Sequence, residues 1–160
     1  MKTLLVLAVC WYVQDLVQIL VTQTFLAPEF FAVALLDCAT RSREPDAPYS
    51  WIAAALVGGF LLDLRWIGVP GLSAALYISA LLAARWFWYE VPADSRKMLP
   101  YLVITCVLCL MTTPARLFFW DASVTSGRLL SIVGIQWLFT FFAVVVSALT
   151  RDFSYDEERL

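Results

Sequence analysis

Long apolar runs separated by short polar turns dominate the chain from its first residues to about residue 150. An α-helix rises about 1.5 Å per residue, so about 20 residues are needed to cross the ~30 Å hydrocarbon layer of a membrane. Measured against that length, the runs predict six transmembrane helices, at residues 3–23, 26–40, 50–66, 71–90, 98–115 and 128–149. The pattern predicts an all-α integral membrane protein whose single domain covers residues 1–160.

The second and third runs are the shortest of the six. The second begins at Pro28 and Glu29 and contains Asp37, so on its own it also fits a buried or re-entrant helix. The two runs must both cross or both fail to cross, because a single missing crossing would invert every later segment. The distribution of basic residues decides between these possibilities.

With a cytoplasmic N-terminus and six crossings, most basic residues fall on the cytoplasmic side. The cytoplasmic group comprises Lys2, Arg41, Arg43, Arg85, Arg96, Lys97, Arg151 and Arg159, and the external group comprises Arg65, Arg116 and Arg128. This asymmetry obeys the positive-inside rule. We therefore expect a multi-pass protein of the bacterial inner membrane, with both termini and the polar tail at residues 150–160 in the cytoplasm.

Composition agrees with a membrane protein. The sequence is 62% hydrophobic, with a mean hydropathy of +0.80, and this is more apolar surface than one water-soluble core can cover. The 11 basic and 13 acidic residues form no patch that could follow a phosphate backbone, so we expect no nucleic-acid partner.

The N-terminal segment MKTLLVLAVC is similar to a signal sequence that ends at a cysteine. Val9 is a poor residue before a cleavage site, and the apolar run continues beyond Cys10 through WYVQDLVQILV. We interpret the segment as an uncleaved first helix.

All four cysteines lie inside apolar runs, where disulfide formation is improbable. Cys106 and Cys109 match the CxxC spacing, but the sequence contains no second such pair and no histidine. We expect small apolar side chains one helical turn apart, and neither a metal site nor a cofactor.

Three aspartates lie inside the predicted helices, where each costs roughly 2.5 to 3.5 kcal/mol unless it has a partner. Asp15 is central in the first helix and has Gln14 and Gln18 beside it as expected hydrogen-bond donors. Asp37 is near the inner end of the second helix, and Asp63 is near the outer end of the third.

Asp63 has Arg65 nearby, with Arg116 and Arg128 on the same predicted side, so we expect it to form an ion pair. The alternative role for the three aspartates is a relay for protons or cations, which requires them to line one water-accessible cavity.

Small residues recur every four positions along the fourth helix, at Gly71, Ala75, Ser79 and Ala83. This spacing places them in one stripe, and such stripes let two helix backbones approach closely. The third helix carries a similar set at Gly58, Gly59 and Asp63. Either the third and fourth helices pack on each other through these residues, or part of the stripe receives a helix from another protein.

The sequence contains none of the usual catalytic motifs. It has no histidine, no nucleophile elbow, no HExxH motif and no phosphate-binding glycine loop. Asp15, Asp37 and Asp63 come from three different helices and form no aspartyl motif. We therefore expect a protein that is not an enzyme.

Three motifs in residues 28–92 resemble those of the rod shape-determining protein MreD family. They are PEF at residues 28–30, GGFLLDL at residues 58–64 and PGLSAALY at residues 70–77, in the order and spacing of that family. The sequence departs from the family pattern in the turn after Asp63, where RWIGV replaces a smaller and more polar stretch.

The resemblance implies a six-helix fold similar to the substrate-binding subunits of energy-coupling-factor transporters. It also implies a non-catalytic scaffold of the bacterial cell-elongation machinery, with MreC as its direct partner through transmembrane helices. MreB, RodA and the penicillin-binding transpeptidase of RodA belong to the same complex. The alternative is a substrate-binding subunit of a vitamin-type uptake transporter, which is disfavoured because the first helix has no AxxxA face.

Overall fold

The computed structural model describes residues 2–21, 26–41, 50–67, 69–92, 95–118 and 126–151. These residues form six α-helices and one π-helical segment, and they contain no strand. The all-α prediction is confirmed. The elements are α1 (Lys2–Leu20), α2 (Phe30–Arg41), α3 (Ser50–Leu62), the π-helix η1 (Asp63–Ile67), α4 (Leu72–Glu90), α5 (Met98–Phe118) and α6 (Ser126–Thr150).

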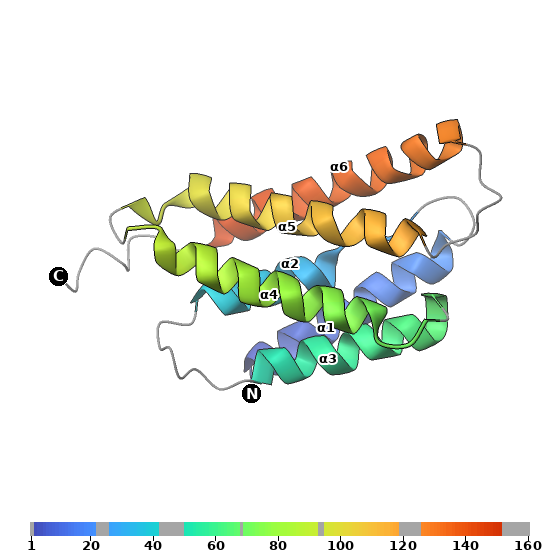
Figure 1. The fold of residues 1–160 in the computed structure, drawn as a ribbon, viewed down its shortest axis with the longest axis horizontal. Coiled ribbons are helices and arrows are strands. Elements are labelled where there is room, and N and C mark those ends of the chain that lie inside the picture. The colour runs from blue at the N-terminus through green and yellow to red at the C-terminus, as the bar shows by residue number, and fades with distance from the viewer. Residues whose placement is uncertain are drawn as a thin grey trace.

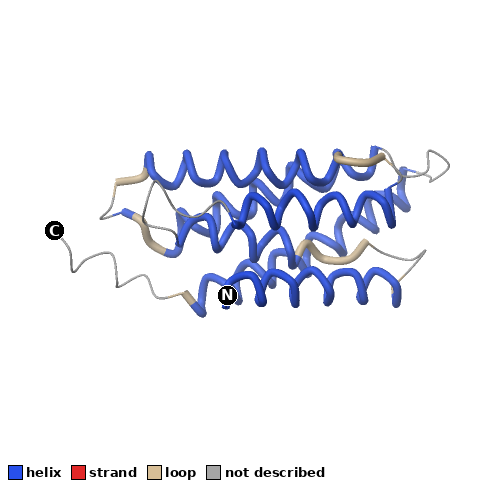
Figure 2. Tube along the Cα trace, turned by 90° about the horizontal axis from the view of Figure 1, so that it is seen from below, coloured by secondary structure: helices blue, strands red, loops and turns tan. Residues whose placement is uncertain are grey.

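The helices form one bundle in which successive helices run in opposite directions (Figure 1). The starts of α1, α3 and α5 therefore lie at the same end of the bundle as the ends of α2, α4 and α6. Seen from the side, the helices lie roughly along a common axis (Figure 2). The polar tail after Arg151 and the turn that contains Arg43 lie outside the described residues.

Among the described residues, two helices are long and apolar enough to cross a membrane, over Thr3–Leu20 and Leu130–Thr150. Met98–Thr113 is a shorter apolar stretch within α5. Length and composition of the described helices therefore agree with a membrane protein without establishing six crossings.

The second helix begins later than the sequence pattern predicts. Residues 26–29 are non-helical and buried, and α2 starts at Phe30 instead of residue 26. Pro28 disfavours helical geometry at Ala27 before it. The peptide turns sharply here, and the Phe30 N–H donates to the Pro28 carbonyl at 2.9 Å. In Figure 1, α2 begins well inside the length of the bundle.

The predicted third helix, at residues 50–66, is also interrupted. Regular α-helix ends at Leu62, and the chain continues as the π-helix η1. After a turn, Gly71 has a φ of 91°, a left-handed conformation that glycine adopts without steric cost, and α4 starts at Leu72. The boundaries of the fourth, fifth and sixth helices differ from the prediction by at most three residues.

The closest backbone approach among the described glycines joins α3 to α4. A Cβ atom built on Gly59 would lie 2.5 Å from both the N and Cα atoms of Ala74. On the other side of α3, a Cβ on Gly58 would overlap the Phe31 ring, and the Trp11 indole N–H donates to the Gly58 carbonyl at 3.0 Å. Both glycines therefore serve packing inside the chain.

Candidate functional site

The bundle buries several polar side chains beside its apolar core, and it exposes many large apolar side chains on its outside. Asp63 and Glu29 are completely buried, whereas Leu20 and Leu130 are about three-quarters exposed. The other buried polar or charged residues are Gln14, Asp15, Gln18, Thr40, Ser73, Thr105, Thr112, Thr113, Gln136 and Thr140. A buried polar group is costly unless it is hydrogen-bonded, so the partners of these groups determine how the interior is built.

Side chains from α1 and α6 bind the backbone at the start of α2. The Gln18 amide oxygen accepts from the Ala27 N–H at 2.8 Å, and the Gln14 amide oxygen accepts from the Phe31 N–H at 2.9 Å. The Thr140 hydroxyl accepts from the Glu29 N–H at 3.2 Å. The N–H groups of the non-helical residues and of the first helical turn have no partner within α2, and these three side chains supply partners inside the bundle.

The Glu29 carboxylate joins α2 to α4 and α6. It accepts a hydrogen bond from the Tyr77 hydroxyl at 2.9 Å and a longer one from the Gln136 amide at 3.4 Å. Tyr77 also packs edge-on against the Phe31 ring, with ring centroids 5.7 Å apart. We call Glu29, Tyr77, Gln136 and Thr140 the central polar cluster.

The sequence reasoning missed the central polar cluster. It treated Glu29 only as part of the opening of the second helix, and it assigned no role to Tyr77, Gln136 or Thr140. A usable signal was present, because Glu29 follows Pro28 directly and precedes an apolar helix, where a carboxylate needs a buried donor.

Asp15 is buried and has hydrogen-bond partners, but these are not the ones predicted. Its carboxylate accepts from the Arg65 guanidinium at 2.8 Å and from the Trp66 indole N–H at 2.9 Å. Gln14 and Gln18 instead bind the backbone before and within α2. The π-helical turn brings Arg65 and Trp66 to α1, which local spacing along α1 could not reveal.

Asp63 caps α4 and does not pair with Arg65. Both carboxylate oxygens accept from the Ser73 N–H, at 3.0 and 2.9 Å. A carboxylate at this position satisfies an unpaired helix N–H and interacts favourably with the helix dipole. The expected ion pair of Asp63 with Arg65 is therefore wrong, because Arg65 turns to Asp15; the Arg116 and Arg128 side chains lie outside the described residues.

Asp37 lies at the opposite end of the bundle, among cations and aromatic rings. It contacts Arg41 at 2.7 Å and Arg151 at 3.6 Å. Arg151 also donates to the hydroxyl and carbonyl oxygens of Thr40, at 2.6 and 2.9 Å, and its guanidinium lies over the Trp88 ring. These contacts join the end of α6 to the end of α2.

The three aspartates therefore belong to three separate sets of contacts. Asp15 is bound by side chains of η1, Asp63 by the α4 backbone, and Asp37 by arginines of α2 and α6. Each carboxylate has a donor of its own within the described residues. This arrangement supports structural roles for the three aspartates rather than a relay along one cavity.

The stripe of small residues on α4 points partly outward. Ala75 and Ser79 are exposed, while Gly71 and Ala83 are half-buried. The inner face of the helix is formed by other residues: Ser73, Ala74, Tyr77, Leu81, Ala84 and Trp88. Ala75 and Ser79 are thus left on the surface, and the Ser79 hydroxyl is satisfied locally by the Leu76 carbonyl at 2.9 Å.

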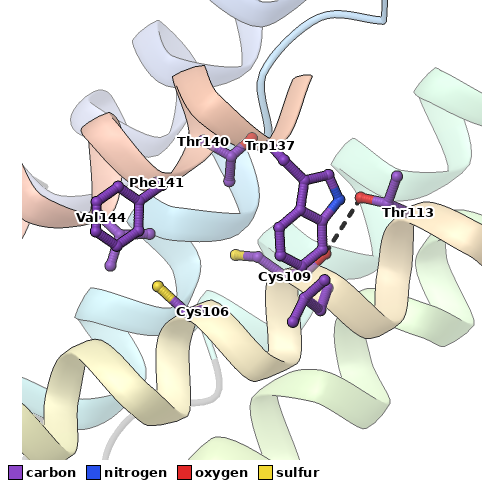
Figure 3. Close-up of a pocket in the computed structure, with 8 residues that line it drawn as sticks. Cys106, Cys109, Thr113, Trp137, Thr140, Phe141 and Val144 are labelled. Atoms are coloured by element: carbon purple, nitrogen blue, oxygen red, sulfur yellow. Dashed lines mark hydrogen bonds between the residues drawn. The ribbon is translucent and has the colours of Figure 1, made fainter. Parts of the chain in front are cut away.

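A small cavity of about 120 Å³ lies between α5 and α6 (Figure 3). Cys106 and Cys109 line it, with Thr113, Trp137 and Thr140 among the other residues around it. The Thr113 hydroxyl donates to the Cys109 carbonyl at 3.2 Å. Ligand pockets commonly have volumes of about 300–1,000 Å³, so this space is small for an organic ligand.

No protein-family model, no curated protein and no solved structure matches this chain. The functional conclusions below therefore depend on the residues and their geometry, together with the motif resemblance described above.

Proposed function

We propose that the chain is a multi-pass membrane protein with six crossings and both termini in the cytoplasm. The observation that carries this proposal is the large number of aliphatic and aromatic side chains exposed on the outside of the bundle, together with carboxylates and amides buried beside its apolar core. Exposed apolar residues occur on every helix except α2, and examples are Leu5, Leu61, Leu82, Met111 and Phe142. Such a surface is unfavourable in water and suits lipid.

The hydrogen bonds of residues 26–29 support a crossing even though α2 is short. The twelve residues of α2 span about 18 Å of the ~30 Å hydrocarbon thickness, and the buried non-helical residues 26–29 lie before them. Non-helical backbone inside a membrane requires protein partners for its polar groups. Gln14, Gln18 and Thr140 supply them.

The basic residues support the orientation. Arg41, Arg96, Lys97 and Arg151 all lie near one end of the bundle, where α2 and α6 end and α5 begins. Under the positive-inside rule, that end faces the cytoplasm. Arg65 lies near the opposite end, where η1 precedes α4.

Reporter fusions distinguish six crossings from two. With six crossings, a reporter fused after Val69 is expected outside the membrane, and reporters fused after Pro92 and after Leu160 are expected in the cytoplasm. If only α1 and α6 crossed, the reporter after Pro92 would also be external. Alkaline phosphatase and fluorescent-protein fusions at these three positions measure this directly, and an external signal at Pro92 would contradict the model.

Within this membrane setting, the proposed role is a non-catalytic scaffold of the cell-elongation machinery. The motifs at residues 28–30, 58–64 and 70–77 support it, because they resemble MreD. The proposed direct partner is the transmembrane helix of MreC, with MreB, RodA and the transpeptidase of RodA in the same assembly.

The exposed part of the α4 stripe is the proposed docking surface for MreC. Ala75 and Ser79 leave a shallow strip on a helix whose inner face is already occupied by Gly59 and the rest of α3. In lipid, helices associate by close packing of small residues, because apolar side chains gain little from leaving lipid tails. A second helix could therefore approach α4 closely here without displacing any internal contact.

Bulky residues on this strip test the docking proposal. The double substitution Ala75→Leu and Ser79→Leu is expected to lower co-purification of MreC at least fivefold, because both side chains would separate the two helix backbones. Neither residue supports the interior, so the yield and melting temperature should stay near those of the wild type. The matched control is Ala8→Leu, at an exposed alanine of α1. Unchanged recovery of MreC would exclude this surface as the docking site.

A further inference from the structure

A groove of about 590 Å³ runs along the surface between α1 and α6. Its floor is α2, which packs against both of these helices and lies between them in Figure 1. The walls are mainly apolar and include Val9, Val13, Val33, Phe139 and Val146. The volume falls within the ~300–1,000 Å³ range of sites for organic ligands.

One end of the groove is polar. Asp37, Arg41, Ser147 and Thr150 line that end, where α2 and α6 finish. Arg41 and Arg151 both form ion pairs with the carboxylate of Asp37. These three side chains together therefore carry one net positive charge. The Arg41 side chain is about half exposed, and its Nε atom is the one that contacts Asp37. The guanidinium is therefore accessible to an anion at the end of the groove.

The length of the groove along the helices matches the thickness of one membrane leaflet. Its α6 wall extends from Phe139 to Thr150, which corresponds to about 16 Å of helix. Half of the hydrocarbon layer is about 15 Å. A transmembrane helix from a partner would need a surface of about twice that length. The groove is limited because its floor starts at Phe30, where the chain enters α2 from the buried segment at residues 26–29.

We propose that this groove binds an anionic phospholipid of the cytoplasmic leaflet, with an acyl chain between α1 and α6 and the phosphate at Arg41. Apolar walls of one-leaflet depth fit an acyl chain, and a net cationic end at the level of the headgroups fits a phosphate with a further negative charge. This inference rests on the proposed membrane orientation, but it is independent of the α4 docking surface. The lipid would fill the space that separates α1 from α6 and would connect their cytoplasmic ends.

Native mass spectrometry of the purified full chain tests the proposal. Delipidated protein is titrated with phosphatidylglycerol or with phosphatidylcholine of the same acyl chains. The wild type is expected to retain one lipid and to prefer phosphatidylglycerol about fivefold, since one basic residue near a membrane surface contributes about that factor. Arg41→Gln should abolish this preference. Lys97→Gln, which removes a cation from the start of α5 at the same end of the bundle, should preserve it.

A groove-filling variant tests the position of the acyl chain. Ala143→Trp places a large ring in the groove from α6 and is expected to reduce retention of either lipid at least tenfold. Ala53→Trp, on the exposed face of α3, is the control for the effect of the ring on folding. Equal binding of both lipids by the wild type and Arg41→Gln would overturn the proposal. Loss of MreC but not of lipid in Ala143→Trp would also overturn it, because a protein helix would then be the occupant.

Failure of this experiment and failure of the scaffold proposal are distinguishable. Lipid selectivity is read from the purified chain alone, whereas MreC docking is read from the α4 variants. If Ala143→Trp does not fold, the comparison of Arg41→Gln with Lys97→Gln still decides the proposal.

Discussion

Replacing Gly59 with alanine is expected to destabilise the protein by about 1–3 kcal/mol, the usual cost of inserting an extra methyl group into a well-packed interior. The new Cβ atom would lie 2.5 Å from backbone atoms of Ala74, and a backbone cannot move aside as a side chain can. To accommodate the new methyl group, α3 and α4 would have to move apart. The hydrogen bonds from the Ser73 N–H to the Asp63 carboxylate hold the same two segments together. The melting temperature of the purified protein in mild detergent measures the effect.

Two other glycines provide an internal scale for this prediction. Gly134→Ala is expected to be neutral or stabilising by up to about 1 kcal/mol, because no atom lies within 4 Å of its new Cβ and alanine favours a helix. Gly58→Ala should fall between the two, since the new methyl group meets the Phe31 ring and not backbone. A Gly59→Ala protein as stable as Gly134→Ala would show that α3 and α4 are not packed as described.

Replacing Glu29 with alanine is expected to lower the free energy of unfolding by about 3 kcal/mol or more. The substitution removes the acceptor for the Tyr77 hydroxyl and the Gln136 amide, and each buried donor left without a partner costs about 1–3 kcal/mol. It also leaves a space where α2, α4 and α6 meet. Unfolding in detergent, followed by helical circular dichroism, provides the measurement.

Glu90→Ala is the matched control, because it removes a glutamate that is exposed at the end of α4. Its stability should stay within about 0.5 kcal/mol of the wild type. Glu29→Gln should lose much less than Glu29→Ala. Its amide oxygen can still accept from Tyr77, and its amide group can donate to the Gln136 Oε1, which accepts no hydrogen bond from the described residues. Equal losses for Glu29→Ala and Glu90→Ala would mean that the central polar cluster adds nothing to stability.

The sequence predicted the number, type and approximate position of the helices, because the hydrophobic pattern is local and its length is set by helix rise. It also predicted that Asp15, Asp37 and Asp63 need partners, because a charge in an apolar helix is costly wherever it lies. The two irregular places, the non-helical residues 26–29 and the π-helix after Leu62, were not predicted, because the sequence pattern indicated continuous helices at residues 26–40 and 50–66. Both occur where backbone and side chains of distant segments compete with regular helix geometry.

The sequence alone did not predict which polar residues pair with one another. Gln14 and Gln18 are neighbours of Asp15 on one helix, so local spacing favoured bonds among them, but the unpaired N–H groups around the start of α2 attract these amides instead. Arg65 is two residues from Asp63 and yet pairs with Asp15, fifty residues away. Asp63 is then available to cap α4.

By itself, the sequence determined an all-α chain of apolar helices with costly charges inside them, since helix rise and the cost of burying a charge act on each segment separately. Only the tertiary structure decided which donor reaches which carboxylate, which side of the α4 stripe faces outward, and that a groove lies between α1 and α6. Those outcomes depend on distances between segments far apart in the chain, and such distances are set when the helices pack together.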